Sequence, residues 1–388
     1  TAGTDRITID RPMNRTTPEP PTLTIHAQRC AHQRVASATC QACVAACPRQ
    51  AWQLLDSGLA FDAALCDGCG LCVAACPHEA LEVPSPTPIL TTDTGRELWL
   101  ACERAGIVKT DAGSSSAGLT ACLHALTPDW LLQWHQRHRI TQVRLASGDC
   151  NTCDRRPAQT LQARWQPVAE RLARAGQPAP ALTRIDARQW QARASRTEQP
   201  DPRRRRFLGQ LLQGPAPQAR DRSQPSTLAP LTSGRQRLVR TLAAPGPRGG
   251  AASPLWQVRL DPDRCTWCMA CANLCPERAL TQIADPDGPV DRLTSEMARC
   301  TGCGLCLDVC DSQALSLAGP GQPHPPAQQV FELVRQTCPV CRVSYHRQAS
   351  PGGASTDEPG PCPTCRRGRP ARPDRLVQTS SEPGGNGV

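Results

Sequence analysis

Residues 265–276 read CTWCMACANLCP and residues 300–311 read CTGCGLCLDVCD, so both segments space four cysteines as C-x2-C-x2-C-x3-C. Residues 66–77, CDGCGLCVAACP, repeat this spacing, and residues 30–48 carry a looser copy whose first gap holds seven extra residues. A [4Fe-4S] cube needs four soft, anionic ligands, and cysteine thiolate supplies them. These sixteen of the 24 cysteines therefore predict bound clusters.

The paired motifs resemble those of the bacterial two-cluster ferredoxins. In that family the fourth cysteine of each motif binds the neighbouring cluster. The resemblance implies four [4Fe-4S] clusters and a split β-α-β fold for two modules, residues 22–88 and 254–318. The implied ligand sets are Cys30, Cys40, Cys43 and Cys76 (set one); Cys66, Cys69, Cys72 and Cys47 (set two); Cys265, Cys268, Cys271 and Cys310 (set three); and Cys300, Cys303, Cys306 and Cys275 (set four).

Two other uses of such cysteines are a disulfide framework and a series of zinc knuckles. No segment resembles a signal peptide, and a chain of 388 residues does not need disulfides for stability. Zinc sites would not require motifs in crossed pairs. Because reduced thiols and oxygen-sensitive clusters belong in a reducing compartment, we expect a cytoplasmic protein. No run of 18 apolar residues occurs, so we expect no transmembrane segment.

The net charge of +10 arises from one stretch of the chain, since residues 155–250 hold 19 Arg and 5 Asp or Glu. Within it, residues 200–250 are rich in Pro, Gly, Arg and Ser, which predicts a basic, flexible linker. Residues 1–21 and 376–388 predict a disordered lead-in and a disordered tail. The arginines accompany no recognisable binding motif and no interleaved aromatic residues, so nucleic-acid binding is not expected.

Residues 95–190 alternate between strand and helix patterns. Their order predicts a small α/β domain with a parallel sheet, with strands at 97–101, 141–145 and 181–185 and helices at 128–138 and 160–174. Two cysteines of this domain directly follow predicted strands, at the edge where such sheets place their sites. We therefore expect its four cysteines to converge: Cys102, Cys122, Cys150 and Cys153.

Three segments of this domain resemble the iron–sulfur delta subunit of the methyl-viologen-reducing hydrogenases, a family that couples hydrogenase to heterodisulfide reductase. The matching residues are Ala101-Cys102, Leu119-Thr120-Ala121-Cys122 and Gly148-Asp149-Cys150. The resemblance implies one [2Fe-2S] cluster here. The family has a further cysteine soon after the first, where this chain has Glu103-Arg104-Ala105, and Cys153 is the candidate replacement. A zinc site, or thiols that bind no metal, are the alternatives.

The last four cysteines form two C-x2-C pairs, Cys338-Pro-Val-Cys341 and Cys362-Pro-Thr-Cys365, separated by 20 residues. This spacing is typical of a zinc ribbon, in which two knuckles surround one metal ion with four sulfurs. We therefore expect one zinc in a ribbon at residues 330–372. A mononuclear iron of the rubredoxin type has the same four ligands and is the alternative.

Together these patterns predict an α+β protein with two ferredoxin-like dicluster modules, an α/β domain between them and a C-terminal zinc ribbon. The chain has no dinucleotide-binding loop, P-loop, metalloprotease motif or evident nucleophile–base pair. We therefore expect an electron-transfer subunit or accessory that passes single electrons to or from a larger redox enzyme. The resemblance favours hydrogenase and heterodisulfide-reductase-like complexes over formate dehydrogenase as the partner. The alternative is an assembly, maturation or redox-sensing accessory factor for such an enzyme.

Overall fold

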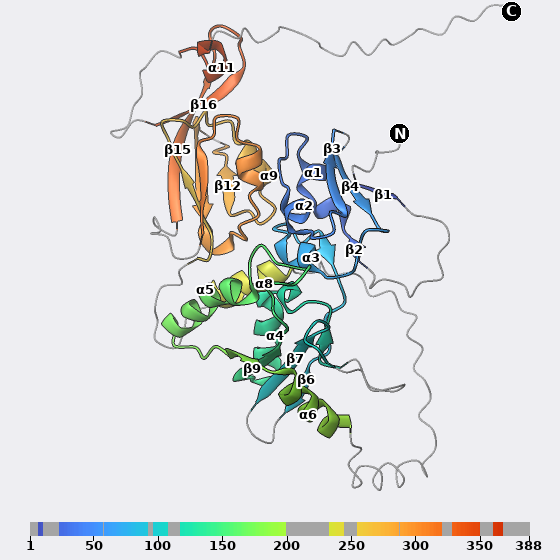
Figure 1. Ribbon diagram of the computed structural model, residues 1–388. Coiled ribbons are helices and arrows are strands. Elements are labelled where there is room, and N and C mark those ends of the chain that lie inside the picture. The colour runs from blue at the N-terminus through green and yellow to red at the C-terminus, as the bar shows by residue number, and fades with distance from the viewer. Residues whose placement is uncertain are drawn as a thin grey trace, which may run out of the picture.

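A computed structural model describes most of the chain between residues 23 and 367 and leaves the predicted tail at 376–388 outside the described part. Figure 1 shows two modules side by side, in blue and orange, and a third, green domain packed below them in this view. None of the helices in the described part combines the length and apolar character needed to cross a bilayer. The described residues are 7–10, 23–56, 58–91, 96–107, 117–198, 233–243, 254–286, 288–319, 328–349 and 360–367.

The first module pairs the strands at its two ends and places a hairpin between its two cysteine motifs. Its elements are β2 (Thr24–Ile25), η1 (Ala27–Arg29), α1 (Ala31–Arg34), α2 (Ala42–Ala46), β3 (Trp52–Leu55), β4 (Gly58–Asp62), α3 (Leu71–Ala75) and β5 (Leu81–Glu82). β2 and β5 pair antiparallel, as do β3 and β4. Trp52, Leu59 and Phe61 of the hairpin form one buried cluster with four of the module's cysteines. The core of this module is therefore built around its thiols.

One strand lies where the sequence predicts disorder. β1 (Ile7–Asp10) pairs in parallel with β4, with Ile7 opposite Leu59. Residues 1–21 are predicted as a disordered lead-in, but Ile7–Asp10 within them form an edge strand. The remainder of the lead-in lies outside the described residues. The alternation of apolar and polar residues in Ile-Thr-Ile-Asp is compatible with a strand, but four residues acquire this structure only through pairing with a partner strand.

The second module repeats the order of the first. Its elements are β11 (Gln257–Leu260), α9 (Ala270–Leu274), β12 (Leu280–Ile283), β13 (Val290–Glu296), η3 (Met297–Arg299), α10 (Leu305–Asp308) and β14 (Leu315–Ala318). β11 and β14, at the two ends, pair antiparallel, and β12 and β13 form the hairpin between the motifs. The duplication of the cysteine motifs is thus accompanied by a duplication of the strand pairing.

The C-terminal strands extend the sheet of the second module. Beyond β14 the described chain forms β15 (Gln328–Thr337), β16 (Ser344–Gln348) and α11 (Pro363–Arg366). β15 pairs with both β13 and β16, which gives the strand order β12-β13-β15-β16. The buried carboxylate of Asp291 on β13 accepts hydrogen bonds from Arg335 at 2.6 Å and from His346 at 2.7 Å. The described part of residues 330–372, predicted as a separate ribbon, therefore contributes strands to the sheet of this module.

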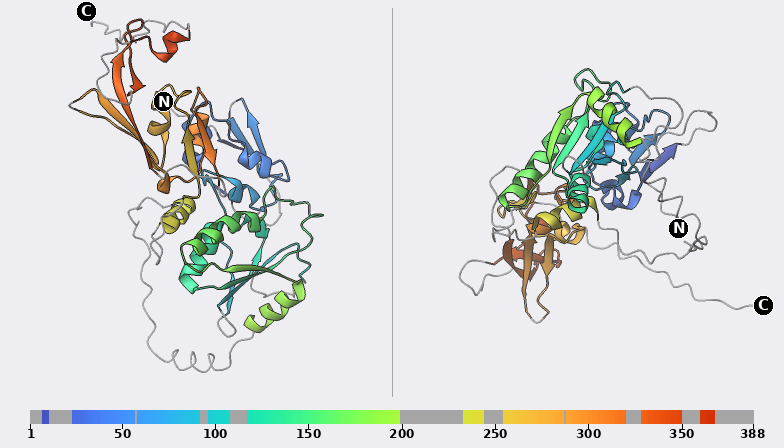
Figure 2. Two further views of the ribbon diagram at one scale, coloured as in Figure 1. Left: turned by 90° about the vertical axis from the view of Figure 1, so that its left-hand side faces the viewer. Right: turned by 90° about the horizontal axis from the view of Figure 1, so that it is seen from below.

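The α/β domain has a sheet between two layers of helices (Figure 2). Its elements are β6 (Ile89–Thr91), β7 (Glu97–Cys102), β8 (Leu119–Thr120), η2 (Leu123–Ala125), α4 (Pro128–His138), β9 (Gln142–Ala146), α5 (Leu161–Arg174), β10 (Ala181–Ile185) and α6 (Ala187–Glu198). β7, β9 and β10 run parallel, in the alternation with helices that the sequence predicts. Leu98 and Leu100 of β7 pack with α4 and α5, whereas Trp99 and Ala101 pack with Trp190 of α6, because side chains alternate along a strand.

Part of the predicted linker is a helix. α8 (Gly234–Ala243) begins with a capping box in which Ser233 and Gln236 exchange two hydrogen bonds, at 3.0 and 3.1 Å. The helix buries Leu238 and Val239 and contacts α4 of the α/β domain and η3 of the second module. Residues 200–250 are therefore not a flexible linker throughout, and the rest of that segment lies outside the described residues.

Candidate metal centres

The fourth cysteine of every C-x2-C-x2-C-x3-C motif is followed by the same backbone geometry. Three residues later a non-glycine residue has positive φ in each case: Gln50 (55°), Glu79 (49°), Arg278 (52°) and Gln313 (50°). Four residues later a backbone N–H donates to the cysteine Sγ at 3.2–3.3 Å: Ala51 to Cys47, Ala80 to Cys76, Ala279 to Cys275 and Ala314 to Cys310. The motif with the longer first gap and the motif with Asp311 in place of proline therefore fold like the other two.

In the first module the thiols gather across the two motifs. Burial raises the pKa of the Cys43 thiol, and so do the neighbouring thiols, which are Cys76, Cys40, Cys72 and Cys30. Burial also raises the pKa of Cys72 to about 12, despite its hydrogen bond with Trp52, and Cys66 and Cys47 contribute to the rise. Cys76 thus lies near the cysteines of the first motif, as set one predicts, and Cys47 lies near Cys66 and Cys72, as set two predicts, while Cys72 adjoins both groups.

The second module has the same crossed grouping. Burial raises the pKa of Cys271 to about 12, and the thiols that add to this effect are Cys268, Cys265 and Cys310. Burial likewise raises the pKa of Cys306, whose thiol neighbours are Cys303, Cys300, Cys271 and Cys275. Apart from Cys271, which adjoins both groups, these neighbours are the members of sets three and four. These neighbours agree with sets three and four, and the assignment of the sixteen cysteines to four clusters stays a prediction.

The cysteines of set two surround a common space. Its four cysteines line one small cavity together with Trp52: Cys47, Cys66, Cys69 and Cys72. Four sulfurs that face a common space are the ligands that an iron–sulfur cube requires. Because the ligands bind as thiolates and burial raises the pKa of these thiols, binding of a cluster would release their protons.

Two parts of the chain match known families. Residues 264–315 match the family described as 4Fe-4S dicluster domain, and residues 59–82 match the family described as 4Fe-4S binding domain. The chain contains two ferredoxin-type [4Fe-4S] domains. Such domains indicate a role in iron–sulfur electron transfer. The first match spans both motifs of the second ferredoxin module, whereas the second match spans only the Cys66–Cys76 motif of the first. No curated protein matches the chain.

The C-terminal cysteines form a compact tetrad. The four sulfurs of Cys338, Cys341, Cys362 and Cys365 lie within 4.8 Å of one another, a spacing that suits a metal ion. Ligands at about 2.3 Å from a tetrahedral ion lie about 3.8 Å apart, and the Sγ atoms of Cys341 and Cys362 are 3.7 Å apart. Burial raises the pKa of the Cys338 thiol, but backbone N–H groups of Cys341, Cys362 and Val340 donate to it and lower the pKa to about 6. The tetrad is thus suited to one tetrahedral metal ion.

The thiol of Cys122 in the α/β domain has the other three cysteines of this domain as neighbours. Burial raises the pKa of Cys122 to about 11, and its thiol neighbours are Cys102, Cys150 and Cys153. The loops that carry them approach closely at Gly148, where a Cβ atom would lie 2.3 Å from the backbone oxygen of Arg104. Glycine at this position therefore lets the loop after β9, which holds Cys150, pack on the loop after β7.

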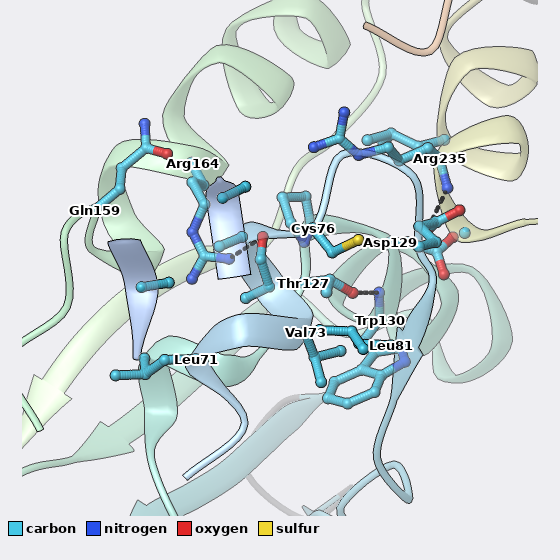
Figure 3. Close-up of a pocket in the computed structure, with 18 of the residues that line it drawn as sticks. Leu71, Val73, Cys76, Leu81, Thr127, Asp129, Trp130, Gln159, Arg164 and Arg235 are labelled. Carbon is cyan, nitrogen blue, oxygen red and sulfur yellow. Dashed lines mark hydrogen bonds between the residues drawn. The ribbon is translucent and has the colours of Figure 1, made fainter. Parts of the chain in front are cut away.

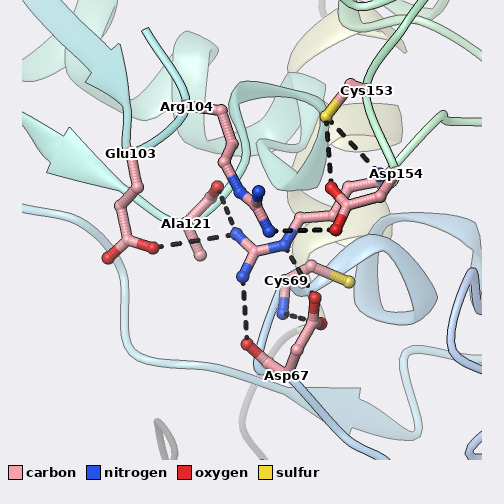
Figure 4. A network of polar contacts seen from close by, with 8 residues as sticks. Asp67, Cys69, Glu103, Arg104, Ala121, Cys153 and Asp154 are labelled. Carbon is pink, nitrogen blue, oxygen red and sulfur yellow. Dashed lines mark hydrogen bonds and ion pairs between the residues drawn. The ribbon is translucent and has the colours of Figure 1, made fainter. Parts of the chain in front are cut away.

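A network of polar contacts joins this site to the first ferredoxin module (Figure 4). The Arg155 guanidinium donates to the Asp67 carboxylate at 2.7 Å and to the Ala121 backbone oxygen at 2.9 Å. Its own backbone N–H donates to the sulfur of Cys153 at 3.4 Å. Asp67 lies between Cys66 and Cys69 of set two, so one arginine contacts the loops of both sites. Arg155 could not be identified from the sequence, because nothing in its local pattern indicates a partner 88 residues away.

A cavity of about 620 Å³ lies between the first module, the α/β domain and α8 (Figure 3). Cys76 of set one lines it, and so do Arg164 and Arg235. Arg164 donates to the backbone oxygens of Ala74 and His124, and burial lowers its pKa to about 10. The side chains of Arg164 and Arg235 therefore line the space beside Cys76.

Proposed function

We propose that the protein is an iron–sulfur electron-transfer protein that relays single electrons to or from a larger redox enzyme complex. The sixteen cysteines of sets one to four would hold four [4Fe-4S] clusters, which accept and donate one electron at a time when bound. The observation that carries the proposal is that cysteines of different sites share apolar clusters across the domain boundaries. Isolated storage or structural clusters would not need such contacts.

Two such clusters connect the three domains. Cys69 of set two packs with Leu71 and Cys122, so the first ferredoxin module adjoins the cysteines of the α/β domain. On the other side of the module, Cys40 of set one and Cys303 of set four belong to one apolar cluster. The chain therefore places cysteine groups next to one another from the α/β domain, through the first module, to the second. Such a series supports a relay, because electron transfer needs neighbouring centres.

For the α/β domain we propose one [2Fe-2S] cluster held by Cys102, Cys122, Cys150 and Cys153. The convergence of these thiols and their contact with set two support the resemblance to the hydrogenase delta subunit. The partner would then be a hydrogenase or a heterodisulfide-reductase-like complex, with formate dehydrogenase as a further candidate. For the C-terminal tetrad we propose one zinc, with mononuclear iron as the alternative.

Metal and acid-labile sulfide analysis of anaerobically purified protein, with EPR of oxidised and reduced samples, tests the proposal. Four [4Fe-4S] clusters correspond to about sixteen irons and sixteen sulfides, and a [2Fe-2S] cluster raises the iron to about eighteen. About one zinc is expected at the tetrad. About eight irons or fewer, together with several zinc ions, would refute the relay.

A second function, as an assembly or maturation factor, has one observation in its favour. Val340 and Val343, on either side of Cys341, are 64% and 56% exposed, and an apolar metal knuckle of this kind suits contact with another protein. Turnover distinguishes the two functions. A relay is needed for every catalytic cycle of its partner, whereas a maturation factor can be removed once the partner enzyme is active.

A further inference from the structure

The first turn of α8 contacts three domains at once. The backbone N–H of Arg235 donates to the Glu79 carboxylate of the first module at 2.9 Å. The neighbouring Gln236 donates to the Glu277 carboxylate of the second module at 2.6 and 2.7 Å. Arg237 forms an ion pair at 2.7 Å with Asp129 of the α/β domain. One helical turn therefore fixes the relative placement of all three.

The side chain of Arg235 reaches into the loop of set four. Its Nη1 donates to the backbone oxygen of Thr301 at 2.9 Å, and its guanidinium lies 4.9 Å from the centre of the Trp256 ring. The same ring packs on Gly302, where a Cβ atom would lie 2.4 Å from it, so the loop is held tightly against Trp256. Arg235 thus bonds to the segment between Cys300 and Cys303.

The charges around Arg235 come from both modules. Burial lowers the pKa of its guanidinium, and the groups that raise it are Glu79, Cys76, Cys303 and Cys300. Cys76 belongs to set one, and Cys300 and Cys303 belong to set four. A guanidinium stays protonated at any ordinary pH. Its positive charge therefore lies near cysteines of two different sets, since Arg235 lines the same cavity as Cys76 and bonds to Thr301 beside Cys300.

The insertion in the first motif helps to bring these two sets together. Ala31 and Val35, which lie in its longer first gap, pack on Leu305 of the second module, and Cys40 and Cys303 border the same apolar cluster. Thr39, also in this gap, donates to Asp308 at 3.0 Å. The seven extra residues therefore form part of the surface on which the second module sits.

We propose that Arg235 is a positioning residue that holds sets one and four against each other and raises the reduction potential of the clusters bound there. The inference rests on the proposed function. Reduction adds negative charge to a cluster, and a fixed cation in a partly buried site favours that charge. Removal of the cation should therefore make reduction harder at both sets, although neither set loses a ligand.

Three variants of the full chain test this proposal: Arg235→Gln, Arg235→Lys and the control Arg240→Gln, which alters an exposed arginine of the same helix. The readouts are iron and sulfide content, reduction potentials from EPR-monitored titration, and hydrogen exchange of the loop at residues 300–305. We expect Arg235→Gln to keep its iron, to shift two cluster potentials to more negative values and to speed exchange in the loop. We expect Arg235→Lys to return the potentials towards those of wild type, and Arg240→Gln to match wild type.

The outcomes separate this inference from the proposed function. Wild-type protein without iron refutes the proposed function, whatever the variants do. Iron-loaded Arg235→Gln whose potentials and exchange equal those of Arg240→Gln refutes the inference alone. If Arg235→Gln does not retain iron, Arg235→Lys decides. Faster hydrogen exchange of the loop at residues 300–305, with cluster potentials near those of wild type, supports the positioning role of Arg235. Loop exchange equal to that of wild type overturns the inference.

Discussion

Replacement of Arg155 by glutamine should loosen the contact between the α/β domain and the first ferredoxin module. The Arg155 side chain is 8% exposed and that of Asp67 is 22% exposed, so the variant leaves a largely buried carboxylate without its partner. Removal of one member of a buried ion pair costs about 3–5 kcal/mol. Because Asp67 keeps some contact with water and accepts a hydrogen bond from the backbone N–H of Cys69, the lower end applies.

We therefore expect the free energy of local opening at this boundary to fall by about 3 kcal/mol, which corresponds to an opening constant about a hundredfold larger. Hydrogen exchange of the amides around Cys69 and Ala121 measures this quantity and needs no two-state unfolding of the whole chain. Burial raises the pKa of the Asp67 carboxyl, but the hydrogen bond and positive charge of Arg155 hold it below its usual range. The variant should therefore raise the pKa of Asp67.

Arg104→Gln is the matched control, since Arg104 belongs to the same network but pairs with Asp154 at the surface. These two side chains are 51% and 45% exposed at a distance of 3.0 Å, so their loss should cost at most about 1 kcal/mol. If Arg155→Gln changes exchange no more than Arg104→Gln does, Arg155 does not hold the two domains together. Burial of the Arg155–Asp67 ion pair would then contribute nothing to the stability of this boundary.

Two further predictions concern the C-terminal half. Cys362→Ser should lower the bound metal by about one ion per chain and leave the iron of the ferredoxin modules in place; elemental analysis that shows no metal lost would exclude the tetrad as a site. Burial raises the pKa of the Asp291 carboxyl, but hydrogen bonds led by those from Arg335 and His346 outweigh it and hold the pKa below its usual range. The ionised Asp291 carboxylate therefore contributes its full stabilisation of the fold above about pH 4, and this contribution is lost as the pH falls below that value. Asp291→Asn should speed exchange at Leu333 at about pH 5 and differ less from wild type at about pH 3; a pH-independent difference would contradict this.

The local chemistry of the metal-binding loops was predictable because it is encoded within a few residues. A C-x2-C-x2-C segment holds three sulfurs close together on its own, and the N–H donor four residues after the last cysteine belongs to the same turn. The α/β domain was predictable for a similar reason. Its strands and helices alternate in apolar periodicity, and Thr127 followed by Pro128 marks the start of α4.

Features that depend on distant contacts were not predictable. The Pro, Gly, Arg and Ser content of residues 200–250 predicts a linker and not the helix α8, although the Ser233–Gln236 capping box is a local signal of its start. β1 exists only through pairing with β4, and β15 joins the second module only because it lies beside β13. Each of these elements is stabilised by a partner that local propensity does not specify.

The sequence by itself determined which cysteines share a motif, since spacing of two and three residues constrains their sulfurs through covalent geometry; their roles as ligands stay a prediction. Only the tertiary structure decided which distant groups come near one another: Cys69 and Cys122 in one apolar cluster, Cys40 and Cys303 at the border of another, and Arg235 near the charges of Cys76 and Cys300. The physical reason is that burial and ion pairing act through space. Partners such as Arg155 and Asp67 are 88 residues apart in the chain and only 2.7 Å apart in the fold.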